Sequence, residues 1–440
     1  MKVKFVLFFM LLVSAVSFAQ LPEFPDPNKG RFTGGFGMTW IDDEPHYTFR
    51  VTPDINLGKW GIGLDVNLDF DKDGKLRNET YKTFSQVLSI IRYVRYGQKN
   101  DKIFAKVGAL DYYTLGQGNL ISNYNNQISF DNRKTGLILD IDFDKFGFES
   151  IYSDFGEGGI FGLRGYARPL RFSQGGNNIP VLNNLEVGVS YVADFNDKAG
   201  IYKFDPNTPG ALVKKDQIGA MSFDVALPFV NTSMFNAAIY ANYTKFFDFG
   251  SGTAAGIKAG LNGLGIVSAA AQLERRFNND KYIPAYFNSL YEVQRYTGPF
   301  SKAAALENAT TSDNGWYGSL LVNVAGMFNI LGSYQRLDKT PNSGILELRS
   351  QITPETAPVV VRAGYEKTGI QSESELFTAD ERSHAYIEAG YKPMQYILVS
   401  LVYHWTFEPM RDGDNKVIGY SPQKRIEPRV TFVYPFSVGN

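Results

Sequence analysis

The sequence predicts an all-β protein, folded as a transmembrane antiparallel up-and-down β-barrel of roughly 18 strands, within a range of about 16 to 20. Three observations support this prediction. Apolar and polar residues alternate over most of the chain, the connections between strands alternate between short and long, and no apolar run after the first 20 residues is long enough for a membrane helix. A spanning sheet must close on itself because lipid leaves no backbone group a partner outside the sheet.

One strand shows the alternation most clearly, over residues 60–70. Its apolar side chains occupy every second position: Trp60, Ile62, Leu64, Val66, Leu68 and Phe70. Small or polar residues stand between them, so the strand has two unlike faces. A soluble sandwich would bury the apolar face in a core, whereas a membrane barrel turns it toward lipid. The pattern recurs without linkers or a second set of core faces, which favours the membrane barrel.

The amino-terminal residues 1–19 are expected to form a cleaved signal peptide. Lys2 and Lys4 precede an apolar run over residues 5–16, and Ser17-Phe18-Ala19 forms a small-x-small cleavage signal. Residues 20–30, which contain three prolines, predict an irregular periplasmic lead-in. We expect a single barrel over residues 31–436 and a short tail at 437–440.

Charge and composition exclude several classes of function. Lys plus Arg number 44 against 45 Asp plus Glu, a formal net charge of −1, which argues against a nucleic-acid partner. The chain has no cysteine, so it can have neither a disulfide framework nor a thiolate metal site. Neither a metal site nor a cofactor is predicted.

The two-residue period continues along almost the whole chain. Further strands are predicted at residues 31–40, 47–51, 91–96, 103–112, 137–143, 146–152, 160–167, 184–193, 218–227, 235–244, 255–261, 265–277, 316–324, 328–337, 345–352, 359–366, 384–391, 396–407 and 426–436. Aromatic residues at strand ends, such as Trp40, Trp60, Tyr391 and Trp405, are expected at the lipid headgroup level. Core aromatics of a soluble β protein are the alternative.

The lengths of the connections give a second signal. Short turns are predicted at 57–59, 98–101, 144–145, 262–263 and 392–395, and the Asn262-Gly263 pair suits a two-residue hairpin. Long polar loops are predicted at 71–79, 115–126, 196–216, 278–314, 369–381 and 410–423. Short turns at one end and long loops at the other are typical of outer-membrane barrels. Residues 171–181 break the rule, being long on the short-turn side.

The closing strand carries a family resemblance. Val430, Phe432, Tyr434 and Phe436 share one face, and with it the chain resembles the bacterial outer-membrane β-barrel (porin-like) superfamily, in which a terminal amphipathic strand ending in an aromatic residue is the assembly signal. Ser437 to Asn440 depart from that pattern by following the aromatic. Residues 93–97, 114–118 and 282–287 are also similar to uncharacterised Bacteroidetes-type outer-membrane proteins. The resemblance implies an outer-membrane location, contact with outer-membrane lipid and insertion by the barrel-assembly machinery, and it allows a homo-oligomer.

If the apolar faces meet lipid, the alternate positions line the lumen. The predicted pore-lining residues are Asp65, Asp69, Lys106, Asp140, Arg164, Glu186, Lys258, Glu274, Arg362, Glu366 and Glu388, with Glu347, Arg349 and Arg429 on the same face. Both signs of charge occur, which suits small polar solutes and gives no strong ion preference by count. Pairing across neighbouring strands, with a purely structural role, is the open alternative.

Two loops are candidates for a constriction, because a barrel of this size is wide enough for a water-filled channel. They cover residues 115–126 and 278–314, and the second contains Tyr286, Phe287, Tyr291 and Arg295. These aromatic residues and the arginine could contact a solute. They could equally pack together as a plug or as an ordered external loop.

Two functions follow from these patterns. The first is a porin-like channel for the diffusion of small polar solutes through a mixed-charge lumen. The second is a non-transporting surface or binding barrel with a plugged lumen. An enzyme is not expected, because the histidines His46, His384 and His404 stand in no recognisable arrangement with a nucleophile.

Overall fold

A computed structural model of the chain describes residues 29–77, 81, 84–264, 266–325, 327–352, 358–414 and 416–437. The predicted signal peptide 1–19, most of the predicted lead-in and residues 438–440 lie outside the described residues. None of the described helices is both long and apolar enough to cross a membrane.

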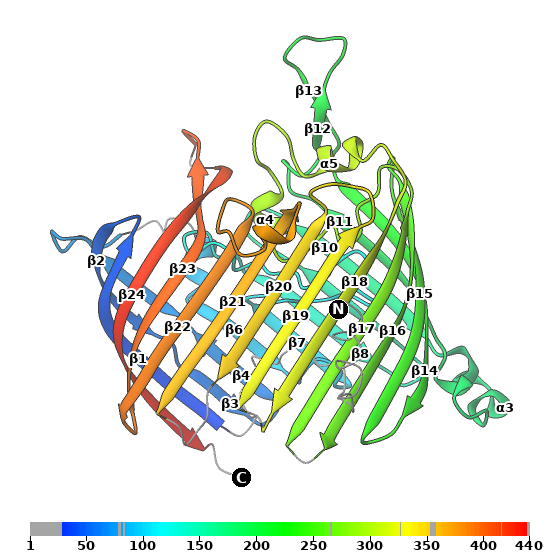
Figure 1. Ribbon diagram of the computed structural model, residues 1–440, viewed down its shortest axis with the longest axis horizontal. Coiled ribbons are helices and arrows are strands. Elements are labelled where there is room, and N and C mark those ends of the chain that lie inside the picture. The colour runs from blue at the N-terminus through cyan, green and yellow to red at the C-terminus, as the bar shows by residue number, and fades with distance from the viewer. Residues whose placement is uncertain are drawn as a thin grey trace, which may run out of the picture.

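The first and last strands close the sheet into a barrel (Figure 1). Strand β1 (Lys29–Ile41) pairs with β2 (Glu44–Val51) on one side and with β24 (Val417–Ser437) on the other, antiparallel in both cases. The described residues form a sheet of 22 strand segments. Segments β2 and β3 (Asp54–Leu57) are halves of one strand, as are β4 (Trp60–Leu64) and β5 (Val66–Phe70), so the barrel has 20 strands. This confirms the predicted fold at the upper end of the predicted range.

The remaining strands differ in length around the barrel. Strands β6 to β9 have only six or seven residues, whereas β14 to β17, which follow after β10 and β11 around the barrel, have 12 to 14. The bounds are β6 (Ile91–Tyr96), β7 (Ile103–Gly108), β8 (Gly136–Asp142), β9 (Phe146–Tyr152), β10 (Ile160–Ala167), β11 (Glu186–Asp194), β14 (Ile218–Asn231), β15 (Phe235–Phe246), β16 (Ser251–Leu264), β17 (Val267–Asn278), β18 (Asp313–Val324), β19 (Phe328–Leu337), β20 (Gly344–Ile352), β21 (Val359–Ile370), β22 (Ser383–Met394) and β23 (Ile397–Arg411).

The helices are short and lie in connections. They are α2 (Phe84–Leu88), α3 (Gln174–Asn177), α4 (Tyr291–Gln294), α5 (Ala303–Asn308) and the 3-10 turns η2 (Pro169–Phe172), η3 (Leu182–Asn184) and η4 (Glu373–Glu375). Strands β12 (Ile201–Phe204) and β13 (Leu212–Lys214) pair only with each other and project from the top of the barrel in Figure 1. The sequence pattern gave no indication of these helices.

The alternation in sequence becomes an outward apolar and an inward polar face. On β4 the outward Trp60 and Ile62 are exposed, while Gly61 and Gly63, which alternate with them, are buried; on β5 the inward Asn67 and Asp69 are buried. The same arrangement holds for the last strand, where Val430, Phe432 and Tyr434 are exposed; the side chain of Phe436 lies outside the described part of the chain. An exposed apolar surface all around a closed sheet is the face that a barrel presents to lipid.

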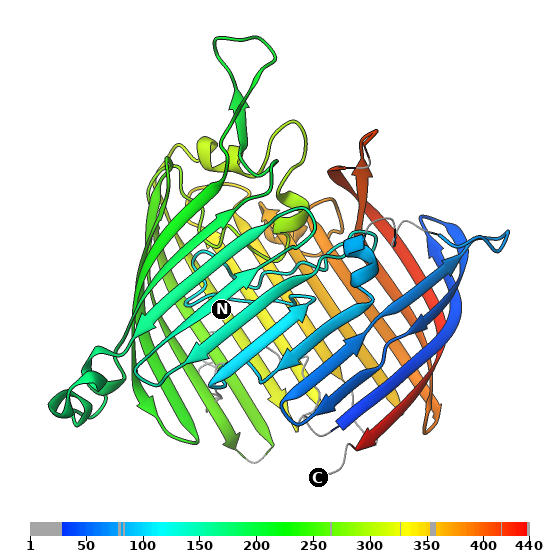
Figure 2. The ribbon, with the colours of Figure 1, turned by 180° about the vertical axis from the view of Figure 1, so that it is seen from behind.

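The two ends of the barrel are unlike. The start of β1, the end of β24 and the short turns gather at the bottom of Figure 1, and the long loops, α4, α5 and the β12–β13 hairpin gather at the top. One connection on the short-turn side is long: residues 168–185, here called the foot, which contain η2, α3 and η3. In Figures 1 and 2 α3 stands outside the barrel wall near its lower rim.

Candidate functional site

Two long connections from the upper end fold into the lumen. Residues 109–135, between β7 and β8, are called the strap, and residues 279–312, between β17 and β18, are called the cap. Their backbones run side by side: Ser122 N–H donates to the carbonyl of Phe287 (3.1 Å), and Phe287 N–H donates to the carbonyl of Leu120 (3.1 Å). The two predicted constriction loops therefore contact each other inside the barrel.

Aromatic side chains form the centre of this contact. Tyr286, Phe287 and Tyr291 of the cap are fully buried, with ring centroids 4.9 to 5.6 Å apart. They pack with Leu115, Ile121 and Tyr124 of the strap and with Phe104 and Phe246 of the wall. Tightly packed rings of this kind stabilise a fixed arrangement of loops. Whether they narrow a path for solutes, as predicted, remains a prediction.

A buried cluster of charges fastens the cap to the strap and the wall. Arg295 donates to Asp194 of β11 (2.6 Å) and to both carboxylate oxygens of Glu292 (2.7 Å each). Lys134 of the strap contacts Glu292 (2.5 Å) and Asp154 (3.5 Å). We call these five residues the lock. The positive groups of Arg295 and Lys134 lower the pKa of Glu292 to about 2 although burial raises it.

The strap crosses the lumen to the far wall. Close to its start, the Tyr113 hydroxyl donates to Asp140 of β8 (2.9 Å). Farther along, Ser129 Oγ donates to the carbonyl of Phe407 on β23 (2.7 Å), and Asn132 Nδ2 donates to the hydroxyl of Tyr420 on β24 (2.6 Å). Because β8 lies far around the barrel from β23 and β24, the strap runs across the lumen between them.

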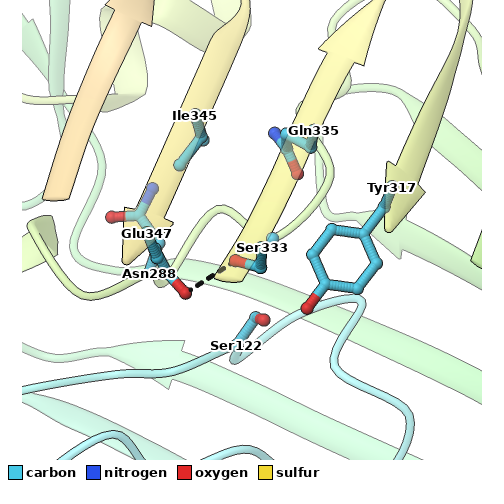
Figure 3. Close-up of a pocket in the computed structure, with 8 residues that line it drawn as sticks. Ser122, Asn288, Tyr317, Ser333, Gln335, Ile345 and Glu347 are labelled. Carbon is cyan, nitrogen blue, oxygen red and sulfur yellow. Dashed lines mark hydrogen bonds between the residues drawn. The ribbon is translucent and has the colours of Figure 1, made fainter. Parts of the chain in front are cut away.

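A small polar crevice remains where both loops meet the wall. Ser122 of the strap and Asn288 of the cap face Tyr317, Ser333 and Glu347 of β18 to β20 across it (Figure 3). Ser333 donates to Glu347 Oε2 (3.0 Å), and Ser289 and Asn123 donate to the same carboxylate. These hydrogen bonds hold the Glu347 carboxylate in place. The crevice therefore connects the strap and the cap to the barrel wall at β20.

The predicted pore-lining residues all project from the inward face, and each has a polar or charged partner. Asp65 and Asp69 bind arginines, Lys106 binds Asp111, Asp140 binds Lys99, Arg164 binds Asp224 and Glu186, Lys258 binds Gln117, Glu274 binds Arg276 and Tyr240, Glu366 contacts Arg349, and Glu388 binds both Arg362 and Arg429. Pairing between these residues and their neighbours is therefore extensive. A role of the pore-lining residues in solute selection stays a prediction.

On the inner wall from β21 to β6, the charge that faces water depends on which side chains are exposed, rather than on how many acidic and basic residues there are. Between β21 and β6 four arginine side chains keep part of their contact with solvent: Arg50 is 24%, Arg92 40%, Arg362 28% and Arg429 22% exposed. Arg95 of β6 and Arg425 of β24, on the same wall, are fully buried. The carboxylates beneath them are more covered, at 11% for Asp65, 6% for Glu388 and 5% for Glu427. Arg31 on β1, lower on the same wall, is also exposed. In these pairs the cation is therefore the more water-facing partner, whereas Glu408 of β23, beside Arg77, is a carboxylate that is 41% exposed.

Three more guanidinium contacts converge on the strap. The Phe130 ring lies 5.7 Å from Arg50, 5.5 Å from Arg133 and 4.9 Å from Arg425. Arg425 also binds Asp69 (2.7 Å), and Asp65 binds both Arg50 (2.9 Å) and Arg133 (3.1 Å). Cation–π contacts of this kind stabilise partly buried arginines without neutralising their charge.

Sequence reasoning missed several of these residues. Arg31, Arg50 and Arg92 were not among the predicted lining residues, although Arg50 stands between the outward Phe49 and Val51 and the alternation alone would place it inward. The lock residues Lys134 and Glu292 lie in loops and carry no periodic signal, and Asp194 of β11 directly follows the predicted strand 184–193. The described residues contain no group of His, Cys, Asp and Glu that could hold a metal ion.

Solved structures of outer-membrane proteins show a distant likeness. Pseudomonas aeruginosa OccK11 (OpdR) matches with 11% identity and a TM-score of 0.32, over 93% of this chain and 96% of that one. OccK10 (OpdN) of the same organism matches with 10% identity and a TM-score of 0.34, over 94% and 100%. Acinetobacter baumannii OccAB3 matches with 10% identity and a TM-score of 0.31, over 93% and 98%. No family model and no curated protein matches the sequence. At that level of likeness, the function must be argued from this chain's own residues.

Proposed function

We propose that this protein is a porin-like channel of the bacterial outer membrane, through which small polar solutes diffuse, with a preference for anionic ones. One observation carries the proposal: the partly exposed guanidinium groups of Arg50, Arg92, Arg362 and Arg429 on an inward wall, where Asp65 and Glu388 are more deeply covered than the arginines that bind them. A polar lumen inside a shell of outward apolar side chains supports the membrane location.

The chemistry of passage follows from these arginines. A guanidinium binds a carboxylate or phosphate through planar paired hydrogen bonds, so a row of partly hydrated guanidiniums offers an anion successive weak sites. Because Arg362 and Arg429 already share Glu388, each binds a passing anion less tightly than a lone arginine would. Weak, repeated binding favours entry and release alike.

The test is a single-channel measurement in planar bilayers. Purified protein should produce conductance steps, and a salt gradient should give a reversal potential on the chloride side of zero. A reversal potential on the potassium side would contradict the anion preference while keeping the channel. Complete absence of steps would contradict the channel itself. A heat-modifiable shift on gels tests the barrel independently of transport.

The strap and the cap favour a second candidate, a surface or binding barrel with a plugged lumen. Buried aromatic packing and the lock hold both loops within the barrel. A plugged barrel predicts no conductance for the native protein and large conductance once residues 279–312 are replaced by a short glycine-serine linker. A channel predicts steps in both, larger in the shortened variant.

The cellular location and the partners of the protein belong to the same proposal. Residues 1–19 act as a cleaved signal peptide, residues 20–30 as a periplasmic lead-in and residues 31–436 as the membrane domain. The barrel-assembly machinery inserts the protein into outer-membrane lipid, and self-association into a homo-oligomer is compatible with its outward face. Mass spectrometry of the mature amino terminus tests the cleavage site.

A further inference from the structure

We propose that the foot, residues 168–185, lies in the headgroup region of the bilayer leaflet on the short-turn side and inserts its apolar side chains among the lipid chains there. This rests on the membrane location proposed above. Among the connections that the structure describes at the otherwise short-turn end, the foot is the long one, and it stands outside the wall in both views of the barrel (Figures 1 and 2).

The composition of the foot suits a lipid surface. Its outer part, residues 172–185, contains no charged side chain. Four large apolar residues there are exposed: Phe172 (58%), Ile179 (41%), Val181 (39%) and Leu182 (45%). The remaining residues are mostly Asn, Gln, Ser and Gly, which can bond with headgroups and water. Uncharged apolar residues next to small polar ones are the composition of segments that lie in the membrane interface.

The charges of the foot are confined to its base and tie it to the barrel. Arg168 bonds with Asp142 and Glu186 (3.0 Å each). Arg171 binds Asp144 (2.5 Å) and reaches across the foot to the carbonyl of Asn183 (3.2 Å). Because Arg171 holds both ends of the loop against the β8–β9 turn, the foot keeps a defined height on the wall.

The foot lies at the short-turn edge of the exposed apolar surface that surrounds the barrel. The β8–β9 turn carries Phe143 and Phe146, exposed rings stacked with centroids 5.0 Å apart. Lys145 between them has its ammonium 5.8 Å from the ring of Phe172 in the foot. Aromatic residues at strand ends mark the headgroup level of a barrel. The foot therefore continues the lipid-facing surface sideways, which favours phospholipid over a soluble partner as its occupant.

The projecting β12–β13 hairpin at the opposite end provides the contrast. It also exposes apolar side chains, Phe204 and Leu212, but Lys203 and Lys214 flank them. It rises along the barrel axis away from the wall in Figure 1. A segment with that direction and those charges belongs in water, so it serves as the internal negative control.

Single-cysteine labelling tests the proposal on the full chain. The protein has no cysteine of its own, so Ile179→Cys and Leu182→Cys each carry one fluorescent label. Val189→Cys on the outward face of β11 is the lipid-exposed control, and Asn207→Cys in the hairpin is the water-exposed control. Each variant is refolded into vesicles of phosphatidylethanolamine and phosphatidylglycerol, with folding confirmed by the heat-modifiable gel shift, and quenching by brominated acyl chains is measured.

We expect quenching at positions 179 and 182 to reach at least about half of that at 189 and about threefold that at 207. Quenching equal to that at 207, with strong quenching at 189, would place the foot in water and overturn the proposal while the membrane location stands. Weak quenching at 189 as well would overturn both. Labels shielded both from water and from the brominated acyl chains, together with dimers linked through the unlabelled cysteine, would assign the foot to a second copy of the chain and overturn the lipid assignment.

Discussion

Charged residues have different structural roles in two regions of the lumen, the lock and the wall from β21 to β6. Beside the strap and the cap, Asp194, Glu292 and Arg295 are buried and bonded to one another, and the ions serve as fasteners. On the wall from β21 to β6, Arg362 and Arg429 cover Glu388 and turn toward water. The same residue types therefore build a joint on one side and a water-facing surface on the other. Burial, which depends on the inward loops, decides between the two.

The largest effect is expected from breaking the lock. Arg295→Met leaves the buried carboxylates of Asp194 and Glu292 short of a cation, which costs about 3 to 5 kcal/mol for an unpaired buried charge. We expect the cap to become sensitive to limited proteolysis and the channel current to become noisier or larger, while the barrel remains heat-modifiable. Unchanged protease resistance would show that aromatic packing alone holds the cap.

A surface pair in the same region is the control for that change. Lys203 contacts Glu307 of α5 at 3.5 Å and is 44% exposed. Lys203→Gln should alter stability by no more than about 1 kcal/mol, as exposed pairs do. Proteolysis patterns of this variant and of the native protein should coincide.

The second effect should appear on the water-facing wall. Replacing Arg362 and Arg429 together by Gln uncovers the Glu388 carboxylate and changes the local charge by two units. The permeability ratio of chloride to potassium should fall on the order of threefold or more. Reversal potentials in a salt gradient measure this ratio directly.

Arg275→Gln provides the matched control for selectivity. Arg275 also pairs with a carboxylate, Asp338, at 2.5 Å, but it shares the outward face with Leu273 and Phe277 and lies against the Trp316 ring. Loss of this cation should leave the reversal potential unchanged. A similar shift in both variants would mean that overall charge, and not the lumen wall, sets the ion preference.

A smaller effect is expected at the border between the halves. Asp65 bonds with Arg50 of the wall (2.9 Å) and Arg133 of the strap (3.1 Å). Asp65→Asn removes the negative charge and leaves two guanidiniums, so chloride preference should rise modestly while thermal stability falls. Paired measurements of reversal potential and melting temperature check both directions. Lower chloride preference would contradict the anion preference proposed for this wall.

The sequence predicted the barrel well because a period of two is a local property. Asp65, Glu388 and Arg362 alternate with apolar neighbours, so their inward direction could be predicted without knowing any partner. The lock could not be predicted in this way. Lys134 and Glu292 are far apart in the chain and lie in loops without periodicity, so only the packing of strap against cap brings them together. The sign of the charge that the lumen wall presents to water also could not be predicted by counting acidic and basic residues. It depends on which charged groups reach water in the folded barrel.

The smallest expected effect is that of pH on the lock. It tests whether the ion pairs of Glu292 hold the cap in place. The pKa of Glu292 is lowered to about 2 by Arg295 and Lys134, from an ordinary value near 4.5. A carboxyl group with a lowered pKa contributes stability that is fully present above its unfolded pKa and is lost as the pH falls toward the folded value. Burial lowers the pKa of Lys302, which also lies in the cap, to about 7, so the test uses a Lys302→Met variant. Between pH 5 and 8, taken as about the working range, the cap of this variant should keep its protease resistance unchanged. Loosening of the cap within that range would mean that a group other than Glu292 controls it, and the lock would then not be the fastener of this half of the lumen.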